Sequence, residues 1–352
     1  MRAACSKTLS SKWMVFTLFV LLVLVAGSAA AFLAISTSSA AVAADATPSP
    51  APLRPVTLGM GYIPNVQFAP FYVADAKGYF AAEGLQVEFK YGMEDDLLKL
   101  IGTDRLQFAI GSGDQVILAR SQGLPAVYAA NFYRKFPVNV MSLKEKNIKT
   151  PKDLEGKRVG TPCLCGANYI GWQALAYAAG IDTQKVNLQV IGYTQPAMVE
   201  RGLVDAALDY TVNGPVQLRL ANKEVNEIFV SDFINLVSNG IITNDQTVEK
   251  EPALVQGFVR AFLRGLRDTL ADPQEALDIT LKYVPEAGGK NRPTTEAVLK
   301  ASINLWQGDN LGVSQRQDWA DSQSFMKKVG LISQETDVDK LFTNRFVTEA
   351  PK

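Results

Sequence analysis

Histidine is absent from the 352-residue chain, and cysteine occurs only at Cys5, Cys163 and Cys165. Without an imidazole there can be no Ser-His-Asp triad, no Cys-His pair and no histidine-ligated metal. Two thiols without a histidine make a poor metal site, and the C-x-C spacing is too tight for an easy disulfide. Carboxylate and lysine chemistry stay open. The composition nevertheless favours binding over catalysis, with no metal and no cofactor.

An excess of one charge is lacking as well, because 35 Lys and Arg residues balance 35 Asp and Glu residues. The first 43 residues hold three basic and no acidic residues, which leaves the remainder with a formal charge near −3. Such a balance gives no sign of nucleic-acid binding. A hydrophobic content of 47% and a charged content of 20% describe a globular protein with a sizeable core.

The only long hydrophobic run lies near the N-terminus. Three basic residues precede an apolar run over residues 13–35, and an Ala-x-Ala triplet follows at 41–43. This order is typical of a secretory signal, although the run is also long enough to span a bilayer. Residues 1–44 are therefore predicted to be a signal peptide or an N-terminal membrane anchor. We expect the protein to be secreted across the cytoplasmic membrane, in the periplasm or at the outer face of the cell membrane.

The remaining chain reads as a tether followed by two similar halves. Residues 45–55 are rich in Pro and Ala, and the roughly 300 residues that follow suffice for two linked lobes. Each half runs strand, polar loop, helix, Gly-apolar stop, strand, helix, strand, polar loop. The sequence thus predicts an α/β fold with two βαβ lobes around a ligand cleft. Lobe 1 is predicted to comprise residues 56–135 and 236–352, and lobe 2 residues 136–235.

Polar loops follow the predicted strands at their carboxyl ends, where ligands bind in open α/β sheets. In the first, Asn65 stands at a helix N-cap position ahead of an apolar helical pattern. In the second, residues 111–114 read Gly-Ser-Gly-Asp, a turn that lets backbone amides approach a ligand. The corresponding loops of the second half are residues 161–168 and 209–215.

Four segments carry a family resemblance: GYIPNVQFAPFYVADAKGYFAAEGLQVEF, FAIGSGDQVILARSQGLPAVYAA, TPKDLEGKRVGTP and NLQVIGY…ERGLVDAALDY. They resemble the solute-binding proteins of ABC importers in the thiamine-pyrimidine, riboflavin, sulfonate and nitrate group. The resemblance extends from Val56 to about Asn344. It implies a type II periplasmic-binding-protein fold, a small-molecule ligand, and permease and ATPase subunits as partners. It also implies lobe closure by hinge motion near residues 131–140 and 226–240.

Residues 63–74 and 160–175 look closest to the vitamin-binding branch, whose members capture riboflavin or formylaminopyrimidine, a thiamine precursor. Pyrimidine binders tend to carry Trp or His near the Pro-Asn pair, where this chain has Tyr62. The resemblance therefore implies riboflavin first, with formylaminopyrimidine or another small heterocycle or sulfonate as alternatives. The predicted cleft loops carry no basic residue, which disfavours a small anion.

A flavin needs aromatic faces for stacking and a few directed polar groups. The predicted loops offer both, although packing or helix capping is an alternative role for each side chain. The candidate ligand-binding residues are Asn65, Gln67, Phe68, Tyr72, Ser112, Asn131, Tyr133, Cys163, Asn168, Tyr169, Trp172, Asp209, Tyr210 and Asn213.

An enzyme remains a remote alternative. A distant eukaryotic branch of the resembled family makes the thiamine pyrimidine, and there a cysteine-rich loop and a histidine take part in the chemistry. The matching region here has only Cys163-Leu164-Cys165, and the chain has no histidine. The two cysteines are expected to be small loop fillers that face the cleft.

Overall fold

The computed structural model describes residues 52–348. The predicted signal or anchor and most of the predicted tether lie outside this range. Two residues assigned to the tether already belong to the first strand, since Arg54 and Pro55 pair with Leu85 and Gln86. Among the described helices, none combines the length and the apolar character needed to cross a membrane.

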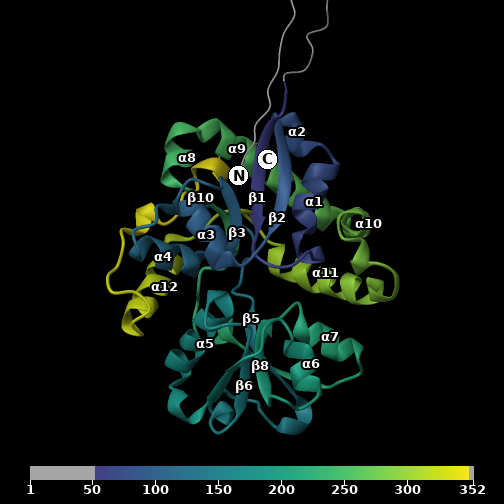
Figure 1. The fold of residues 1–352 in the computed structure, drawn as a ribbon, viewed down its shortest axis with the longest axis vertical. Helices are drawn as coiled ribbons and strands as arrows, with labels where there is room; N and C mark the ends of the chain where they lie inside the picture. Colours follow the sequence, from purple (N-terminus) through teal and green to yellow (C-terminus); the bar gives the residue numbers. More distant parts are fainter. Residues whose placement is uncertain (1–51, 349–352) are drawn as a thin grey trace, which may run out of the picture. The chain divides into compact units, whose positions relative to one another are not determined.

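Two five-stranded sheets organise the described chain (Figure 1). The first has the strand order β2-β1-β3-β10-β4. In it β1 is parallel to β2 and β3, whereas β10 lies antiparallel between β3 and β4. Its strands are β1 (Arg54–Met60), β2 (Leu85–Tyr91), β3 (Phe108–Ser112), β4 (Ala126–Asn131) and β10 (Asn239–Asn244).

The second sheet repeats this plan with the order β7-β6-β8-β5-β9. Here β6 is parallel to β7 and β8, and β5 lies antiparallel between β8 and β9. Its strands are β5 (Val138–Leu143), β6 (Arg158–Thr161), β7 (Asn187–Val190), β8 (Ala206–Tyr210) and β9 (Val225–Phe229). Apart from Arg54 and Pro55 of β1, the strands of each sheet fall within the residue ranges predicted for the two lobes, whose limits stay a prediction. We call the first sheet with its helices lobe 1 and the second lobe 2.

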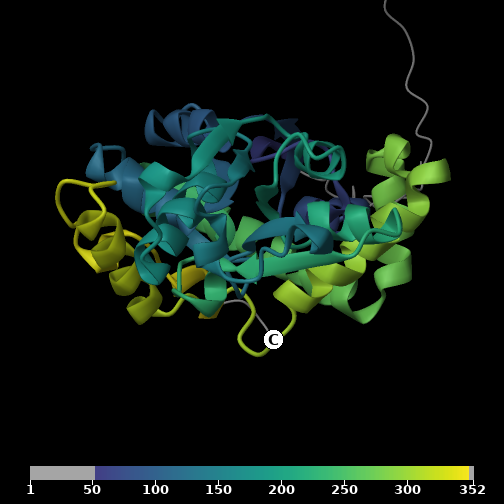
Figure 2. The ribbon, with the colours of Figure 1, turned by 90° about the horizontal axis from the view of Figure 1, so that it is seen from below.

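Ten helices belong to lobe 1 within the described range, and in Figure 2 green α10 and α11 lie on one side of the molecule and yellow α12 on the other. They are α1 (Ala69–Ala76), α2 (Tyr79–Ala82), α3 (Glu94–Gly102), α4 (Gly113–Ser121), α8 (Asp245–Lys250), α9 (Pro252–Ala271), α10 (Pro273–Tyr283), α11 (Arg292–Trp306), α12 (Arg316–Lys328) and α13 (Arg345–Thr348). Lobe 2 carries α5 (Gly166–Ala179), α6 (Gln195–Glu200) and α7 (Gly214–Leu220).

The 20-residue helix α9 forms much of the lobe 1 core. Its apolar residues recur at helical spacing, so one face is buried against the sheet and against α1. The ring of Phe258 stacks on Phe108 with 4.0 Å between centroids, and Phe262 stacks on Phe71 at 4.7 Å. Gly265 lets α9 approach α1, because a Cβ atom there would collide with the carbonyl oxygen of Pro70.

Candidate ligand-binding cavity

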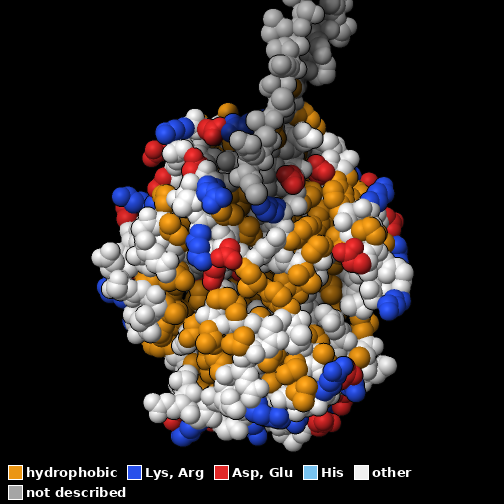
Figure 3. All heavy atoms as spheres, viewed as in Figure 1, with side chains coloured by type: hydrophobic (Ala, Val, Ile, Leu, Met, Phe, Trp, Pro, Cys, Tyr) orange, Lys and Arg blue, Asp and Glu red, His pale blue; other side chains and the backbone are white. Residues whose placement is uncertain are grey.

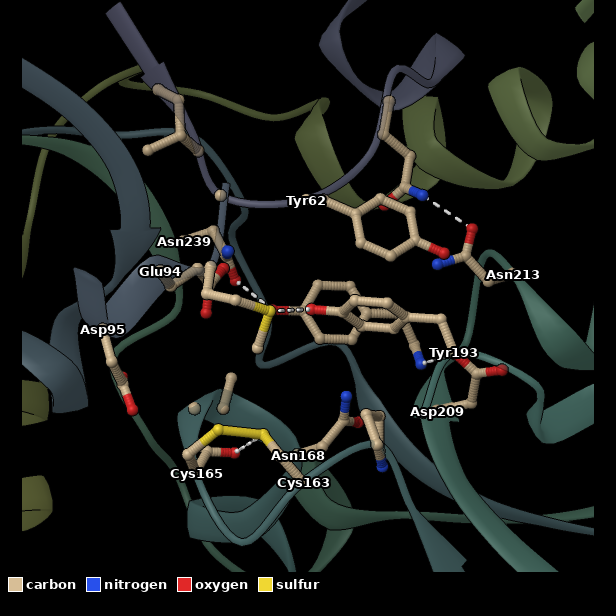
Figure 4. A pocket seen from close by; sticks show the side chains of 18 of the residues that line it. Tyr62, Glu94, Asp95, Cys163, Cys165, Asn168, Tyr193, Asp209, Asn213 and Asn239 are labelled. Carbon is tan, nitrogen blue, oxygen red and sulfur yellow. Dashed lines mark hydrogen bonds between the residues drawn. A yellow bond between two sulfur atoms is a disulfide. The ribbon is translucent and has the colours of Figure 1, made fainter. Parts of the chain in front are cut away.

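A cavity lies between the two lobes, where the carboxyl ends of the parallel strands of both sheets meet (Figure 4). Its empty space is about 790 Å³, with the open solvent at its mouth included. The lining residues are Gly61, Tyr62, Gln67, Phe68, Met93, Glu94, Asp95, Ile110, Phe132, Tyr133, Pro162, Cys163, Cys165, Gly166, Ala167, Asn168, Tyr193, Gln195, Asp209, Tyr210, Asn213 and Asn239.

Apolar side chains gather across the middle of the face shown in Figure 3, around the junction of the two lobes. Several large apolar residues near the cavity mouth are exposed, among them Ile63 at 48% and Leu164 at 58%. Met93 and Tyr193 are also exposed, and both line the cavity itself. The entrance is therefore apolar, which suits the passage of an aromatic ligand.

The structure brings eight of the fourteen predicted ligand-binding residues to the cavity. They come from the loop after β1, the end of β4, the loop after β6 and the end of β8, as the position of ligands in open α/β sheets predicts. Their part in binding stays a prediction. They are Gln67, Phe68, Tyr133, Cys163, Asn168, Asp209, Tyr210 and Asn213.

Three other predicted residues of lobe 1 do not reach the cavity lining, because they cap helices or form pairs elsewhere. The side-chain oxygen of Asn65 accepts a hydrogen bond from the backbone N–H of Gln67 at 3.0 Å, capping the short helix that follows. The hydroxyl of Tyr72 lies 2.6 Å from that of Tyr91, within the core. Ser112 forms a capping box with Gln115 at the start of α4.

The last three predicted residues also lie outside the lining. Asn131 ends β4, and its backbone N–H donates to the carbonyl oxygen of Gly312 at 2.7 Å. Tyr169 and Trp172 belong to α5 but pack against the apolar core that lies beneath that helix. Trp172 is only 2% exposed and lies one helical turn further from the cavity than Asn168. These two aromatic rings therefore contribute to packing.

The sequence analysis missed several lining residues, although they too lie at strand ends on the cavity edge of a sheet. Glu94 and Asp95 follow β2, and Tyr193 and Gln195 follow β7. Both are parallel strands, so their carboxyl ends reach the same edge as those of β1 and β6. Asn239 begins β10, and an antiparallel strand brings its first residue to that edge. Applying the strand-end rule to every strand would have found all five.

Direct contacts join the two lobes across the cavity. Gln67 Nε2 donates to Asn213 Oδ1 at 2.6 Å, and the hydroxyl of Tyr133 donates to Gln67 Oε1 at 3.1 Å. This chain of bonds fixes the orientation of the Gln67 amide. The hydroxyl of Tyr210 donates to the Asn239 side-chain oxygen at 3.1 Å.

An aromatic pair adds to these contacts. The rings of Tyr62 in lobe 1 and Tyr193 in lobe 2 meet edge to face, with 5.0 Å between centroids. Figure 4 shows both rings projecting into the cavity from opposite lobes. The pair therefore places two aromatic rings from opposite lobes in contact within the cavity.

Carboxyl groups in and beside the cavity have no cationic partner. Among the ion pairs of residues 52–348, none involves Glu94, Asp95, Asp114 or Asp209. The same part of the chain contains no group of three or more His, Cys, Asp or Glu side chains that could hold a metal ion. Polar neighbours such as Gln115, whose Nε2 donates to Asp95 Oδ1 at 2.9 Å, take the place of cations.

Burial raises the pKa values of Glu94, Asp114 and Asp209. It raises the pKa of Glu94 to about 8, helped by the nearby charges of Asp114 and Asp95 and opposed by hydrogen bonds from Gln115 and Asn239. Burial raises the pKa of Asp209 to about 7, against the backbone N–H groups of Tyr210 and Gly214. Near neutral pH these carboxyls can carry a proton, so they can donate as well as accept hydrogen bonds.

The fully buried Asp114 gives a stability prediction. Burial raises its pKa to about 7 from an ordinary value of 3.8, so the folded protein binds a proton that the unfolded chain releases between these two pH values. The contribution of Asp114 to the free energy of unfolding is therefore complete below about pH 4, and it is lost as the pH rises toward 7. We expect Asp114→Asn to remove a pH-dependent loss of folding stability on the order of 4 kcal/mol.

Thermal unfolding of the ligand-free protein from pH 4.5 to pH 8 measures this effect. Asp96→Asn is the matched control, since Asp96 is an exposed acidic residue on α3 that pairs with Lys99. The control should keep the wild-type pH profile. A profile for Asp114→Asn as steep as that of the wild type would contradict the prediction.

The two cysteines that line the cavity form a disulfide, Cys163–Cys165. The expectation that their spacing is too tight for a disulfide is wrong. The backbone bends at Leu164, between the two cysteines, and places their Cα atoms 5.2 Å apart, within the range that disulfides span. The cysteines do face the cleft, but as one cross-linked loop ahead of α5.

The sequence profile of the family described as NMT1/THI5 like matches residues 65–276. The chain is 41% identical to riboflavin-binding protein RibY of Chloroflexus aurantiacus over 314 residues, which is 86% of this chain and 90% of RibY. It is 30% identical to a formylaminopyrimidine-binding protein of Halalkalibacterium halodurans over 72% of this chain and 77% of that protein. A 4-amino-5-hydroxymethyl-2-methylpyrimidine phosphate synthase of Legionella pneumophila is 23% identical over 84% of this chain and 93% of its own.

Solved structures share the fold. The alkanesulfonate-binding protein SsuA from Xanthomonas axonopodis pv. citri, bound to MOPS, superposes with a TM-score of 0.67 over 83% of this chain and 99% of its own, at 11% identity. At that identity the likeness concerns the fold alone. The predicted periplasmic-binding-protein fold is confirmed.

Proposed function

The chain belongs to the NMT1/THI5-like family, and from this premise we propose that it captures riboflavin as the extracytoplasmic solute-binding component of an ABC importer. The observation that carries the proposal is the cavity between the lobes, which is aromatic, rich in amides and free of lysine and arginine. That chemistry suits a flat, neutral heterocycle with a hydroxylated tail. The 41% identity to riboflavin-binding protein RibY supports the same ligand.

The lining offers each part of riboflavin a suitable partner. The rings of Tyr62, Phe68 and Tyr193 supply faces for the tricyclic ring system. The amides of Asn168 and Asn239 can pair with its polar edge, and the side-chain oxygen of Asn168 has no hydrogen-bond partner within the protein. The ribityl hydroxyls are donors as well as acceptors, which suits the carboxyl groups of the lining.

Formylaminopyrimidine is the second candidate ligand. The 30% identical relative that binds it, and carboxyl groups able to accept from its amino group, favour this ligand. A sulfonate fits less well, since no lysine or arginine lines the cavity. Pyrimidine synthesis is the remote alternative, and it would have to proceed without histidine.

Lobe closure would report capture to the permease and ATPase subunits. Within residues 52–348 the chain passes between the lobes at residues 132–137 and 230–238, which are the segments between β4 and β5 and between β9 and β10. Two such crossings allow hinge motion, and the Gln67–Asn213 and Tyr62–Tyr193 contacts lie on the surfaces that closure brings together. We expect solution scattering to show compaction on ligand binding.

Titration of the purified chain with riboflavin, followed by flavin fluorescence, tests the ligand. We expect saturable quenching, because a stacked flavin loses its emission, and a rise in Tm with ligand concentration. If the Tm is unchanged by riboflavin but rises with formylaminopyrimidine, the ligand is the pyrimidine, and the proposed class of solute-binding protein stands. Turnover of any bound pyrimidine would instead favour the enzyme.

A further inference from the structure

The cavity holds acidic groups and no basic ones. Glu94, Asp95 and Asp209 line it, and no lysine or arginine does. The two lobes supply the carboxyls from opposite sides, and in Figure 4 Glu94 and Asp209 flank the space that Tyr62 and Tyr193 enter. A ligand between the lobes therefore meets carboxyl groups from both directions.

Within the described range, the fold holds Asp209 in place without pairing it with a cation. This side chain is 5% exposed, and its Oδ1 accepts the backbone N–H of Tyr210 at 2.7 Å. Gly214 leaves the room that the carboxyl occupies, because a Cβ atom at that position would collide with Asp209 Oδ2. The acidic group is thus built into the end of β8.

The amino end of α5 is the part of the cavity best suited to an anion, since helix N-termini carry free N–H groups and positive potential. Lobe 1 already directs an acidic side chain toward it. A Cβ atom on Gly166, the first residue of α5, would lie 3.6 Å from Glu94 Oε2. A second anion at this place would have to displace the Glu94 carboxyl or lie against it.

A phosphate monoester carries between one and two negative charges at neutral pH, and burial of such a group requires cations or several free donors. Resting on the proposed function, we propose that Glu94 and Asp209, in their ionised form, restrict this site to the unphosphorylated vitamin and reject riboflavin 5′-phosphate. The two ligands differ only by the phosphate on the ribityl tail. The aromatic walls cannot tell them apart, so the carboxyl groups determine the specificity.

A consequence concerns the supply of the ligand. Flavin outside the cell that carries a terminal phosphate would have to lose it by phosphomonoester hydrolysis before capture. The reaction class upstream of this protein is therefore a phosphatase reaction, which releases inorganic phosphate and free riboflavin.

Parallel fluorescence titrations with riboflavin and riboflavin 5′-phosphate at pH 9, where both carboxyls are ionised, test the proposal. For the wild type we expect the phosphate to bind at least 100-fold more weakly. Glu94→Gln and Asp209→Asn should each narrow that ratio by tenfold or more, while riboflavin affinity changes less than the ratio does. Asp96→Asn removes an exposed carboxyl from the same helix as Glu94, and it should leave the ratio unchanged.

Thermal unfolding of each variant establishes that it is folded, and Glu94→Gln serves alone if Asp209→Asn fails to fold. Equal affinity of the wild type for the two flavins would overturn this proposal and leave the proposed function intact. An unchanged ratio in Glu94→Gln and in every folded Asp209 variant would overturn the role of these residues. Absence of any saturable quenching would overturn the proposed function, and the specificity with it.

Discussion

Replacing Tyr62 with alanine is expected to weaken riboflavin binding by roughly 10- to 100-fold. The ring projects into the cavity from lobe 1 and meets Tyr193 of lobe 2 at 5.0 Å between centroids. Its removal deletes a stacking face and a contact that joins the lobes. Together these interactions are worth about 1.5–3 kcal/mol, which is one to two powers of ten in Kd.

Fluorescence titration of Tyr62→Ala, Tyr193→Ala and the double variant measures this effect. The two losses should not add, because each single change already breaks the pair. Tyr177→Ala is the matched control, since Tyr177 is a 46% exposed residue of α5 that does not line the cavity. Wild-type affinity in Tyr62→Ala would exclude the ring from the binding surface.

Gly265→Ala is expected to lower the free energy of unfolding by about 3 kcal/mol, which corresponds to a fall in Tm of roughly 5 °C. The added Cβ atom would collide with the carbonyl oxygen of Pro70 and lie 2.8 Å from the Cβ of Ala74. Both belong to α1, a buried helix held by the stacked rings beside it. Because the nearest atom is backbone, rotation of a side chain cannot relieve the collision.

Gly257→Ala provides the control on the same helix. A Cβ atom there would lie 3.1 Å from the Cβ of Glu83 and 3.3 Å from its carboxylate oxygen. A small shift of this side chain can accommodate the methyl group, and alanine favours the helix by up to about 1 kcal/mol over glycine. Chemical denaturation of the two variants should therefore separate them clearly. Equal stabilities would show that α9 can move away from α1 at little cost.

The two similar halves could be predicted from the sequence because the same signals, a glycine after a helix and apolar strand patterns, occur in the same order in both. That repetition gave the two-lobe α/β architecture and the edge at which the cavity lies. Loops chosen by their polar residues then supplied eight lining positions. Residues such as Glu94 escaped notice because acidic side chains in the first turn of a helix are ordinary complements of its dipole.

Side-chain direction limited the rest of the site prediction. Tyr72 and Trp172 lie on helices that begin near the cavity, yet both are buried in the core. A sequence shows which helix an aromatic ring belongs to, but the packing of the neighbouring elements decides how far along that helix the cavity extends. The Cys163–Cys165 disulfide was missed for a related reason, since spacing alone does not reveal the bend of its loop at Leu164.

The position of β10 in the first sheet determines the order in which the two lobes can fold. This strand lies between β3 and β4, although about a hundred residues of sequence separate it from β4. During synthesis from the N-terminus, lobe 2 is complete and contiguous before β10 emerges, whereas β3 and β4 wait with unpaired edges. Lobe 2 can therefore reach its native structure first, and the delayed strand then closes the gap in lobe 1. Until β10 pairs with them, the facing edges of β3 and β4 expose unpaired backbone N–H and C=O groups, which can pair with another chain.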